Sequence, residues 1–176
     1  MTKNTMFSGS ERFFEQNEII VSKTDLKGRI TYANDVFLRI AGFSEKECMG
    51  KAHSLIRHPS MPRSVFALLW SSIEAKKEIF AYVINRSKNG DYYWVNAHVT
   101  PSFNNSDEII GYHSSRRVPD KAIIEKHIIP LYEQLLSIEK SHNNAKEGMN
   151  DAVQFLMDML EKNNIEYDEF IATLAA

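Results

Sequence analysis

The sequence predicts an α+β fold: a five-stranded antiparallel sheet with short helices on one face, followed by a helical extension. Three observations predict it. They are five short runs rich in aromatic and β-branched residues, helical apolar spacing between the second and third runs, and renewed helical spacing from residue 120. This order of elements divides the chain into an N-terminal cap segment (residues 1–18), a sheet domain (19–118) and C-terminal amphipathic helices (119–176).

The sheet is predicted from the five apolar runs and from the turns that join them. We expect strands at residues 19–21, 29–33, 79–86, 92–100 and 109–117. Gly28 provides a positive φ for the turn between the first two strands. Asn89-Gly90 predicts a type I′ hairpin turn, because both central positions of that turn need a positive φ. Along the fourth strand, Tyr93 and every second residue after it are expected to face the core, and Trp94 the opposite side.

Short helices are predicted where a capping residue precedes apolar residues at helical spacing. Asn34 can cap the first helix after the N-terminal hairpin. Ser44 and Glu47 have the spacing of a capping box and predict another short helix. The same spacing in Ser8 and Glu11 predicts a short helix through the two phenylalanines that follow.

Residues 53–62 (HSLIRHPSMP) contain two prolines and are predicted to form an irregular segment or a single helical turn. Pro62 suits the first position of the longer helix that follows. That helix is expected to bury one apolar stripe, which consists of Val65, Phe66, Leu69 and Ile73.

From residue 120 the apolar residues step by four and three, which is typical of a helix that pairs with another helix. They are Ile124, Ile128, Leu131, Leu135 and Ile138. Pro130 is expected to kink this helix near Ile129, and a second amphipathic helix is expected over residues 149–160. We interpret both helices as docking surfaces; folding back onto the sheet and forming a homodimer are the alternatives.

Composition excludes several classes of protein. The 21 basic and 23 acidic side chains give a net charge of -2, which argues against nucleic-acid binding through a basic face. No apolar run approaches the roughly 20 residues that span a bilayer, and the first ten residues lack the apolar stretch of a signal peptide. The single cysteine, Cys48, excludes an internal disulfide and a four-cysteine zinc site. A soluble cytoplasmic protein without direct membrane insertion is expected.

Five motifs of the sheet domain resemble a PAS domain of the bacterial aerotaxis (energy-taxis) receptor type. They are TDLKGRITYAND (24–35), AGFSEKE (41–47), IRHPSMP (56–62), NRSKNGDYYWVNAHVTP (85–101) and GYHSSR (111–116). The similarity runs from about residue 19 to residue 117 and is weaker through 130–132. Members of this subgroup are FAD-binding redox sensors, so the resemblance implies a PAS fold with a flavin pocket under the sheet.

The resemblance also implies a set of cofactor-binding residues. Arg57 and His58 match the flavin-contacting pair of the RHP element, and Trp70 matches an aromatic residue of the long helix. Two positions depart from the subgroup, because Ser60 stands where an aspartate is usual and Ile79 where a tryptophan is usual. These departures remove one carboxylate and one stacking partner from a flavin site. The candidate cofactor-binding residues are Asn34, Arg57, His58, Ser60, Trp70, Asn85 and Tyr93.

These side chains have chemistry that suits a flavin, although each also has a structural alternative. The Asn85 amide can donate and accept hydrogen bonds, or it can cap the hairpin that follows. Arg57 can pair with a phosphate group or remain a surface arginine. His58 can contact the cofactor, ligate a haem or brace its loop, whereas His53 is interpreted as structural. Trp70 can line the pocket or belong to the core.

The sequence contains no signature of catalysis or of a covalently attached cofactor. No cysteine lies in residues 57–62, so the covalent flavin adduct of blue-light PAS relatives is not expected. We find no CxxCH motif for c-type haem, no nucleophile–base pattern, no phosphate-binding glycine loop and no metal-binding motif. An enzyme is therefore not expected.

The sequence predicts a cytoplasmic redox or oxygen sensor that binds FAD noncovalently and relays the flavin redox state to a partner. The alternatives are a sensor of gases that binds haem b through His53 or His58, and a cofactor-free PAS interaction module. The chain carries no transmembrane helix, kinase domain or signalling hairpin, so action in trans is expected. The expected partner is a chemotaxis transducer or a histidine kinase, and the expected assembly is a homodimer.

Overall fold

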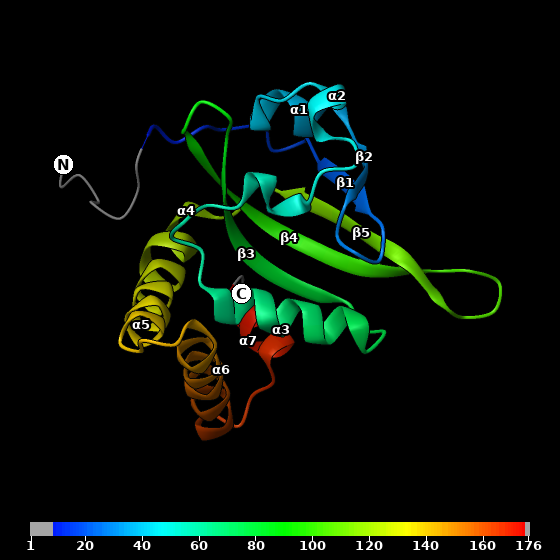
Figure 1. Ribbon diagram of the computed structural model, residues 1–176. Coiled ribbons are helices and arrows are strands. Elements are labelled where there is room, and N and C mark those ends of the chain that lie inside the picture. Colours follow the sequence, from blue (N-terminus) through cyan, green and yellow to red (C-terminus); the bar gives the residue numbers. More distant parts are fainter. Residues whose placement is uncertain (1–8, 175–176) are drawn as a thin grey trace.

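The computed structural model describes residues 9–174 of the 176-residue chain. Its centre is one antiparallel sheet in the order β2-β1-β5-β4-β3 (Figure 1). The strands are β1 (Ile20–Thr24), β2 (Ile30–Ala33), β3 (Ile79–Arg86), β4 (Tyr92–Phe103) and β5 (Ile109–Arg117). The predicted five-stranded antiparallel sheet is thus confirmed.

Strand register decides which side chains face the site. Asn85 of β3 lies opposite Tyr93 of β4, and Ala97 of β4 lies opposite Arg116 of β5. These side chains share the face that the short helices cover, which we call the inner face. Trp94 has the opposite parity, as predicted, yet only 6% of it is exposed because the C-terminal helices cover the outer face.

The inner face is covered by helical segments that follow β2. They are α1 (Asp35–Ala41), α2 (Glu45–Cys48), the 3₁₀ turn η1 (His53–Ile56) and α3 (Arg63–Glu74). Asn34 caps α1, since its Oδ1 accepts a hydrogen bond from the Phe37 N–H at 3.0 Å. The predicted capping box of Ser44 and Glu47 is present at α2. Pro62 occupies the cap position of α3 rather than its first helical position.

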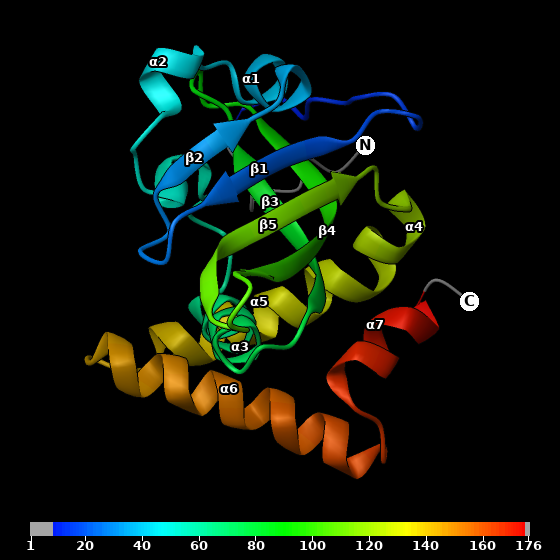
Figure 2. The same cartoon turned by 90° about the vertical axis from the view of Figure 1, so that its right-hand side faces the viewer.

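The C-terminal extension folds back on the sheet. It consists of α4 (Lys121–Ile123), the π-helix η2 (Ile124–Ile128), α5 (Ile129–Lys140), α6 (Ala145–Lys162) and α7 (Tyr167–Leu174). The Tyr132 hydroxyl of α5 donates a hydrogen bond to the backbone carbonyl of Tyr82 in β3, and the Tyr132 ring lies 6.1 Å from the Trp94 ring. Figure 2 shows α6 running beside α3 and α5. The predicted apolar seam is therefore buried within the chain, which corresponds to the fold-back alternative.

Among the described residues, no helix has the length and apolar character needed to cross a membrane.

The predicted N-terminal helix is absent from the part of that segment which the structure describes. Glu11 instead pairs with Tyr92 as a parallel bridge, and the Arg12 N–H donates to the Tyr92 carbonyl at 2.7 Å. Backbone groups of the N-terminal segment thus find hydrogen-bond partners at the start of β4, and the segment does not depend on a helix for them. Ser8, the other half of the expected capping box, lies outside the described residues.

The β3–β4 hairpin also differs from its prediction. A hydrogen bond from the Gly90 N–H to the Ser87 carbonyl closes the turn, and Gly90 has a φ of 93°. Asn89 has no positive φ, so this is not a type I′ turn. One left-handed glycine after an ordinary turn is typical of a three-residue hairpin loop with a bulge.

Pro130 lies in the first turn of α5, directly after the π-helical stretch of η2. The Ile129 N–H bonds to the Ile124 carbonyl, five residues earlier. This wide turn makes room for a proline ring, which in a regular helix would clash with the carbonyl four residues before it. The expected disturbance near Ile129 therefore takes the form of a π turn.

Candidate ligand-binding cavity

A cavity of about 600 Å³ lies between the inner face of the sheet and the segment from η1 to α3. We call it the inner cavity. Most of its wall is apolar, formed mainly by Ile56, Phe66, Leu69, Trp70, Ile73, Val83, Ala97, Val99 and Tyr112. Met149 of α6 also lines it, so the C-terminal extension contributes to the wall. Its volume falls within the range of roughly 300–1,000 Å³ that is typical of small-molecule sites.

Three buried polar atoms on this wall have no hydrogen-bond partner. They are Thr24 Oγ1 of β1, Asn85 Nδ2 of β3 and Arg116 Nη1 of β5. Folded proteins leave few buried polar groups unpaired, and each costs about 1–3 kcal/mol when it lacks a partner. Three such atoms on three strands around one apolar cavity make this cavity the candidate site for a polar-edged ligand.

A polar cluster lies on the same wall. Arg116 Nη2 donates to Ser22 Oγ and to His53 Nε2, both at 2.7 Å. Because a guanidinium only donates, His53 Nε2 is the acceptor and its proton resides on Nδ1. Burial, together with the nearby Arg116 charge, lowers the pKa of His53 to about 3, so the imidazole is neutral. Burial lowers the pKa of Arg116 to about 10, which keeps it charged at neutral pH.

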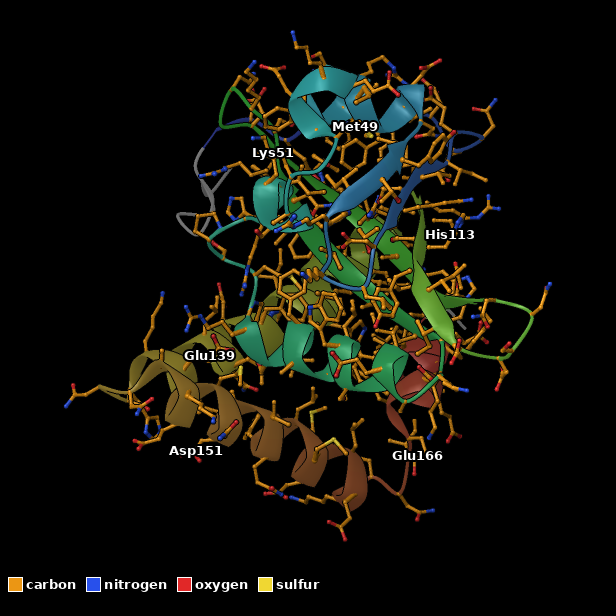
Figure 3. All side chains as sticks on the ribbon, turned by 45° about the vertical axis from the view of Figure 1, so that its right-hand side comes forward. Met49, Lys51, His113, Glu139, Asp151 and Glu166 are labelled. Atoms are coloured by element: carbon orange, nitrogen blue, oxygen red, sulfur yellow. The ribbon has the colours of Figure 1, made fainter. Side chains whose placement is uncertain are left out.

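The cavity also has a basic end, formed where η1 approaches the start of α3. The Arg57 guanidinium lies over the Phe66 ring at 4.5 Å. Its pKa is lowered by burial and by the charge of Arg63, which lines the same cavity. The charge of Glu139 raises the pKa of Arg57. The two Glu139 carboxylate oxygens accept hydrogen bonds from the backbone N–H groups of the first two residues of α3. Figure 3 shows Glu139 of α5 close to that end of α3.

The structure brings only some of the sequence-predicted residues to the cavity. Arg57, Trp70 and Asn85 line it, whereas the wall does not include Asn34, His58, Ser60 or Tyr93. The Trp70 ring meets Tyr112 edge to face at 5.4 Å, which fixes one side of the wall. Asn85 also pairs with Arg57 as an isolated antiparallel bridge, so η1 and β3 hold these two residues together.

The remaining four residues do not line the inner cavity. His58 is 2% exposed, and its Nδ1 accepts a hydrogen bond from the Ser60 N–H at 3.0 Å. Tyr93 is fully buried in the sheet, and burial raises the pKa of its hydroxyl. Besides capping α1, Asn34 donates to the Ile19 carbonyl at 2.8 Å.

The family follows from a comparison with known proteins. A family model described as the PAS fold matches residues 11–114, which include most of the inner cavity. This chain belongs to the PAS family. The PAS domain is 39% identical over 117 residues to the aerotaxis receptor of Escherichia coli (strain K12), an alignment that covers 66% of this chain and 22% of the receptor.

Other relatives of the PAS domain are more distant. It is 28% identical over 103 residues to a nitrogen fixation regulatory protein of Klebsiella pneumoniae, which covers 58% of this chain and 21% of that protein. The chain thus spans about a fifth of the length of these curated relatives.

Solved structures share the fold at low sequence identity. The dark structure of the Aureochrome1 LOV photoreceptor matches with a TM-score of 0.58 and 15% identity, covering 65% of this chain and 86% of that one. A light-oxygen-voltage domain studied with a flavin analogue matches with a TM-score of 0.56 and 14% identity, covering 66% and 87%.

Sequence reasoning missed part of the site of this PAS domain. Arg116, Ser22 and Thr24 were not among the candidates, and His53 was interpreted as structural, with haem ligation as its alternative role. Strand parity was the available signal, because Arg116 shares an alternating pattern with Tyr112 on β5, and both line the cavity. No local signal places His53 there, since its position depends on how η1 packs against the sheet.

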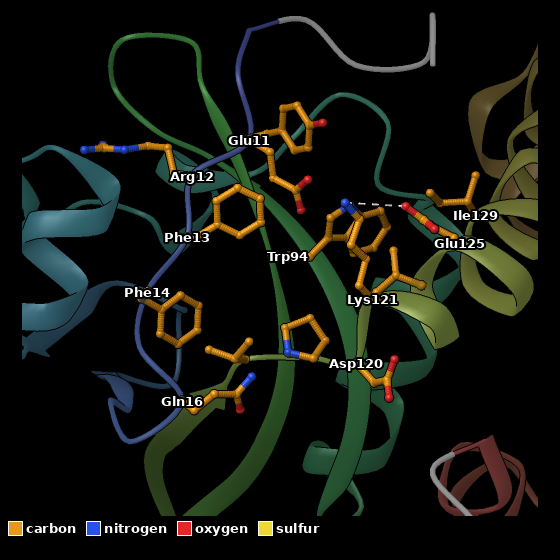
Figure 4. A pocket seen from close by; sticks show the side chains of 14 residues that line it. Glu11, Arg12, Phe13, Phe14, Gln16, Trp94, Asp120, Lys121, Glu125 and Ile129 are labelled. Carbon is orange, nitrogen blue, oxygen red and sulfur yellow. Dashed lines mark ion pairs between the residues drawn. The ribbon is translucent and has the colours of Figure 1, made fainter. Parts of the chain in front are cut away.

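A second hollow of about 620 Å³, the outer groove, lies between the N-terminal segment and the β5–α5 connection of the PAS domain (Figure 4). Phe13, Trp94 and Ile129 are among the residues that line it. Lys121 and Glu125 form an ion pair on its wall at 3.7 Å. Thr24, Asn85 and Arg116, which carry the unpaired atoms of the inner cavity, do not line this groove, so the inner cavity is the candidate ligand site.

Proposed function

We propose that this PAS domain is a redox or oxygen sensor that binds FAD noncovalently in the inner cavity. One observation carries the proposal: three unpaired polar atoms from β1, β3 and β5 surround an apolar cavity of about 600 Å³. The 39% identity to an aerotaxis receptor supports a sensory role. The same fold in the flavin-analogue structure is compatible with a flavin ring. No catalytic role is proposed.

The residues of the cavity fit a flavin nucleotide. A flavin has a flat apolar ring edged by hydrogen-bonding heteroatoms, and a bound flavin would supply a reversible redox change. Trp70 and Phe66 offer apolar walls for the ring, and the Asn85 amide offers an unpaired donor for a ring acceptor. Arg57 and Arg63 give the basic end that suits the phosphates.

Binding is tested on freshly purified protein and then on protein stripped of ligand. We expect flavin absorption bands and recovery of full occupancy when FAD is added. A Soret band would instead indicate the haem alternative. A colourless protein that does not bind added FAD would indicate a cofactor-free interaction module.

Site residues are tested with a matched pair of arginine variants. Arg57→Ala should weaken FAD binding by about tenfold to a hundredfold, because a charge-assisted hydrogen bond contributes about 1.5–3 kcal/mol. Arg117→Ala is the control, since Arg117 is an exposed arginine outside the cavity wall. Equal affinities of the two variants would reject a role for Arg57.

The proposed output runs through α3. Phe66 and Trp70 of α3 line the cavity, and the first turn of the same helix is bonded to Glu139 of α5. A change in the contacts of α3 therefore reaches the C-terminal extension directly. We expect amide hydrogen exchange in α5 to differ between oxidised and reduced protein. Glu139→Ala should abolish that difference in α5 while FAD stays bound.

A chemotaxis transducer or a histidine kinase is the proposed partner, and a cytoplasmic homodimer of this domain relays the flavin redox state to it. Light scattering of the oxidised protein tests the dimer, and a mass equal to one chain would reject it. Binding assays with purified candidate transducers in both redox states test the partner. Equal affinity in the two states would reject a redox-dependent relay, because a ligand shifts an equilibrium only by its differential affinity.

A further inference from the structure

Arg116 is a buried charge without a buried counter-charge. It is 3% exposed, lies on the wall of the inner cavity and stands over the Phe37 ring at 5.7 Å. Within residues 9–174 it forms no ion pair with a carboxylate, and its Nη1 has no hydrogen-bond partner. Unpaired buried charges are costly, so charged side chains in protein interiors are normally paired.

The groups around Arg116 cannot supply the missing negative charge. Its two acceptors are the Ser22 hydroxyl and the His53 imidazole, and both are neutral. The nearby Tyr93 hydroxyl stays protonated, because burial raises its pKa. Neutral partners therefore hold one nitrogen of the guanidinium, Nη2. The other, Nη1, remains unpaired at the cavity wall.

We propose that Arg116 carries the counter-charge for an anionic ligand in the inner cavity, so that the cavity binds reduced, negatively charged flavin more tightly than oxidised, neutral flavin. This inference rests on the proposed function. It deepens that function by assigning the redox preference of the site to one side chain. The preference follows from electrostatics, since Arg116 attracts an added charge but gains little from a neutral ring.

The electron balance is simple. The oxidised ring takes up two electrons from a chemical reductant and one proton from solvent, which leaves the ring with one negative charge. Arg116 stays protonated throughout, because its pKa remains well above neutral pH. The side chain changes neither its charge nor its covalent bonds, and it acts only through differential binding of the two flavin states.

The test compares Arg116→Gln with Arg116→Lys and Arg117→Gln in protein loaded with FAD. Dissociation constants are measured for FAD and for dithionite-reduced FAD, and the midpoint potential is measured by spectroelectrochemistry. We expect Arg116→Gln to lose about tenfold in its preference for reduced flavin, which for two electrons lowers the midpoint by about 30 mV. Arg116→Lys should keep most of the preference, and Arg117→Gln all of it.

The outcomes separate this inference from the proposed function. If the unaltered protein binds no flavin, the proposed function fails. If it binds flavin and Arg116→Gln leaves the midpoint unchanged, the inference about Arg116 fails alone. The unaltered protein also provides a test that does not depend on folding of a variant: its bound flavin must have a higher midpoint than free FAD in the same buffer. A midpoint at or below that of free FAD would overturn the inference.

Discussion

Glu139 near the end of α5 accepts two hydrogen bonds from Ser64 in α3, one from the backbone N–H at 2.9 Å and one from the hydroxyl at 2.8 Å. It also accepts one from the Arg63 N–H at 3.1 Å. Pro62 offers no side-chain cap to α3, so Glu139, which lies 75 positions after Ser64, accepts hydrogen bonds from the open N–H groups of this helix. The C-terminal extension therefore stabilises the helix that forms one wall of the inner cavity.

Removing this cap should cost stability. Glu139→Ala is expected to lower the free energy of unfolding by about 1–2 kcal/mol, because it leaves N–H groups of α3 unpaired and removes a negative charge from the positive end of a helix. Urea denaturation followed by circular dichroism measures the change. The control is Glu133→Ala in the same helix, since Glu133 is exposed. A loss of equal size in both variants would show that helix propensity, rather than the cap, is responsible.

The hydroxyl of Tyr132 joins α5 to the outer face of the sheet through the Tyr82 carbonyl. Tyr132→Phe keeps the ring, which is 2% exposed, and removes only the donor. We expect a loss of about 1–3 kcal/mol, because a buried carbonyl is left unpaired. Hydrogen exchange should rise in α5 and in the middle of β3. If exchange rises uniformly throughout the chain, the bond contributes to global stability but does not hold α5 on the sheet locally.

Local patterns predicted the elements that depend on local interactions. The alternation along β4 placed Tyr93 inside and Trp94 outside, and both lie as expected. The caps by Asn34 and Ser44 also needed only neighbouring residues. These features are readable because strand parity and capping are determined within a few positions of the chain.

The failures involve contacts between distant parts of the chain. The β3–β4 turn is held by α1, since the Ser87 hydroxyl donates to the Ile40 carbonyl and the Lys88 N–H to the Ala41 carbonyl, both at 2.8 Å. These tertiary hydrogen bonds hold the turn against α1. The local preference of Asn-Gly for a type I′ turn could not take them into account. The role of His53 is of the same kind, because its partner Arg116 is 63 positions away.

Gly28 should be sensitive to a side chain for two separable reasons. Its φ is +72°, and an added Cβ would lie 3.3 Å from the Trp70 ring. Gly50 is a matched control, because its φ is +74° and an added Cβ there would meet nothing within 4 Å. Both alanine variants should lose about 1–2 kcal/mol from backbone strain. Only Gly28→Ala should alter tryptophan fluorescence and FAD affinity, since only it displaces the cavity wall. Identical fluorescence in the two variants would contradict this contact.

The half-buried His53 should make stability fall in acid. Its pKa is lowered to about 3 in the folded protein, whereas an unfolded chain has the ordinary value of about 6.5. At pH values between these two pKa values, His53 is protonated in the unfolded state and neutral in the folded state. The stabilisation is therefore complete above about pH 6.5 and is lost as the pH falls, by about 1.4 kcal/mol for each pH unit.

His53→Gln provides the comparison, because a glutamine carbonyl can accept the Arg116 hydrogen bond but does not titrate. Free energies of unfolding are measured by urea titration of both proteins at several values between about pH 4 and about pH 7. The difference between the two proteins should narrow steadily toward acid, since only the unaltered protein pays the cost of excluding a proton. His58 and His113, whose pKa values burial also lowers, are present in both proteins and cancel in the difference. A difference that stays constant across this range would show that His53 is protonated equally in the folded and unfolded states. The conclusion that the imidazole beside Arg116 is neutral would then be wrong.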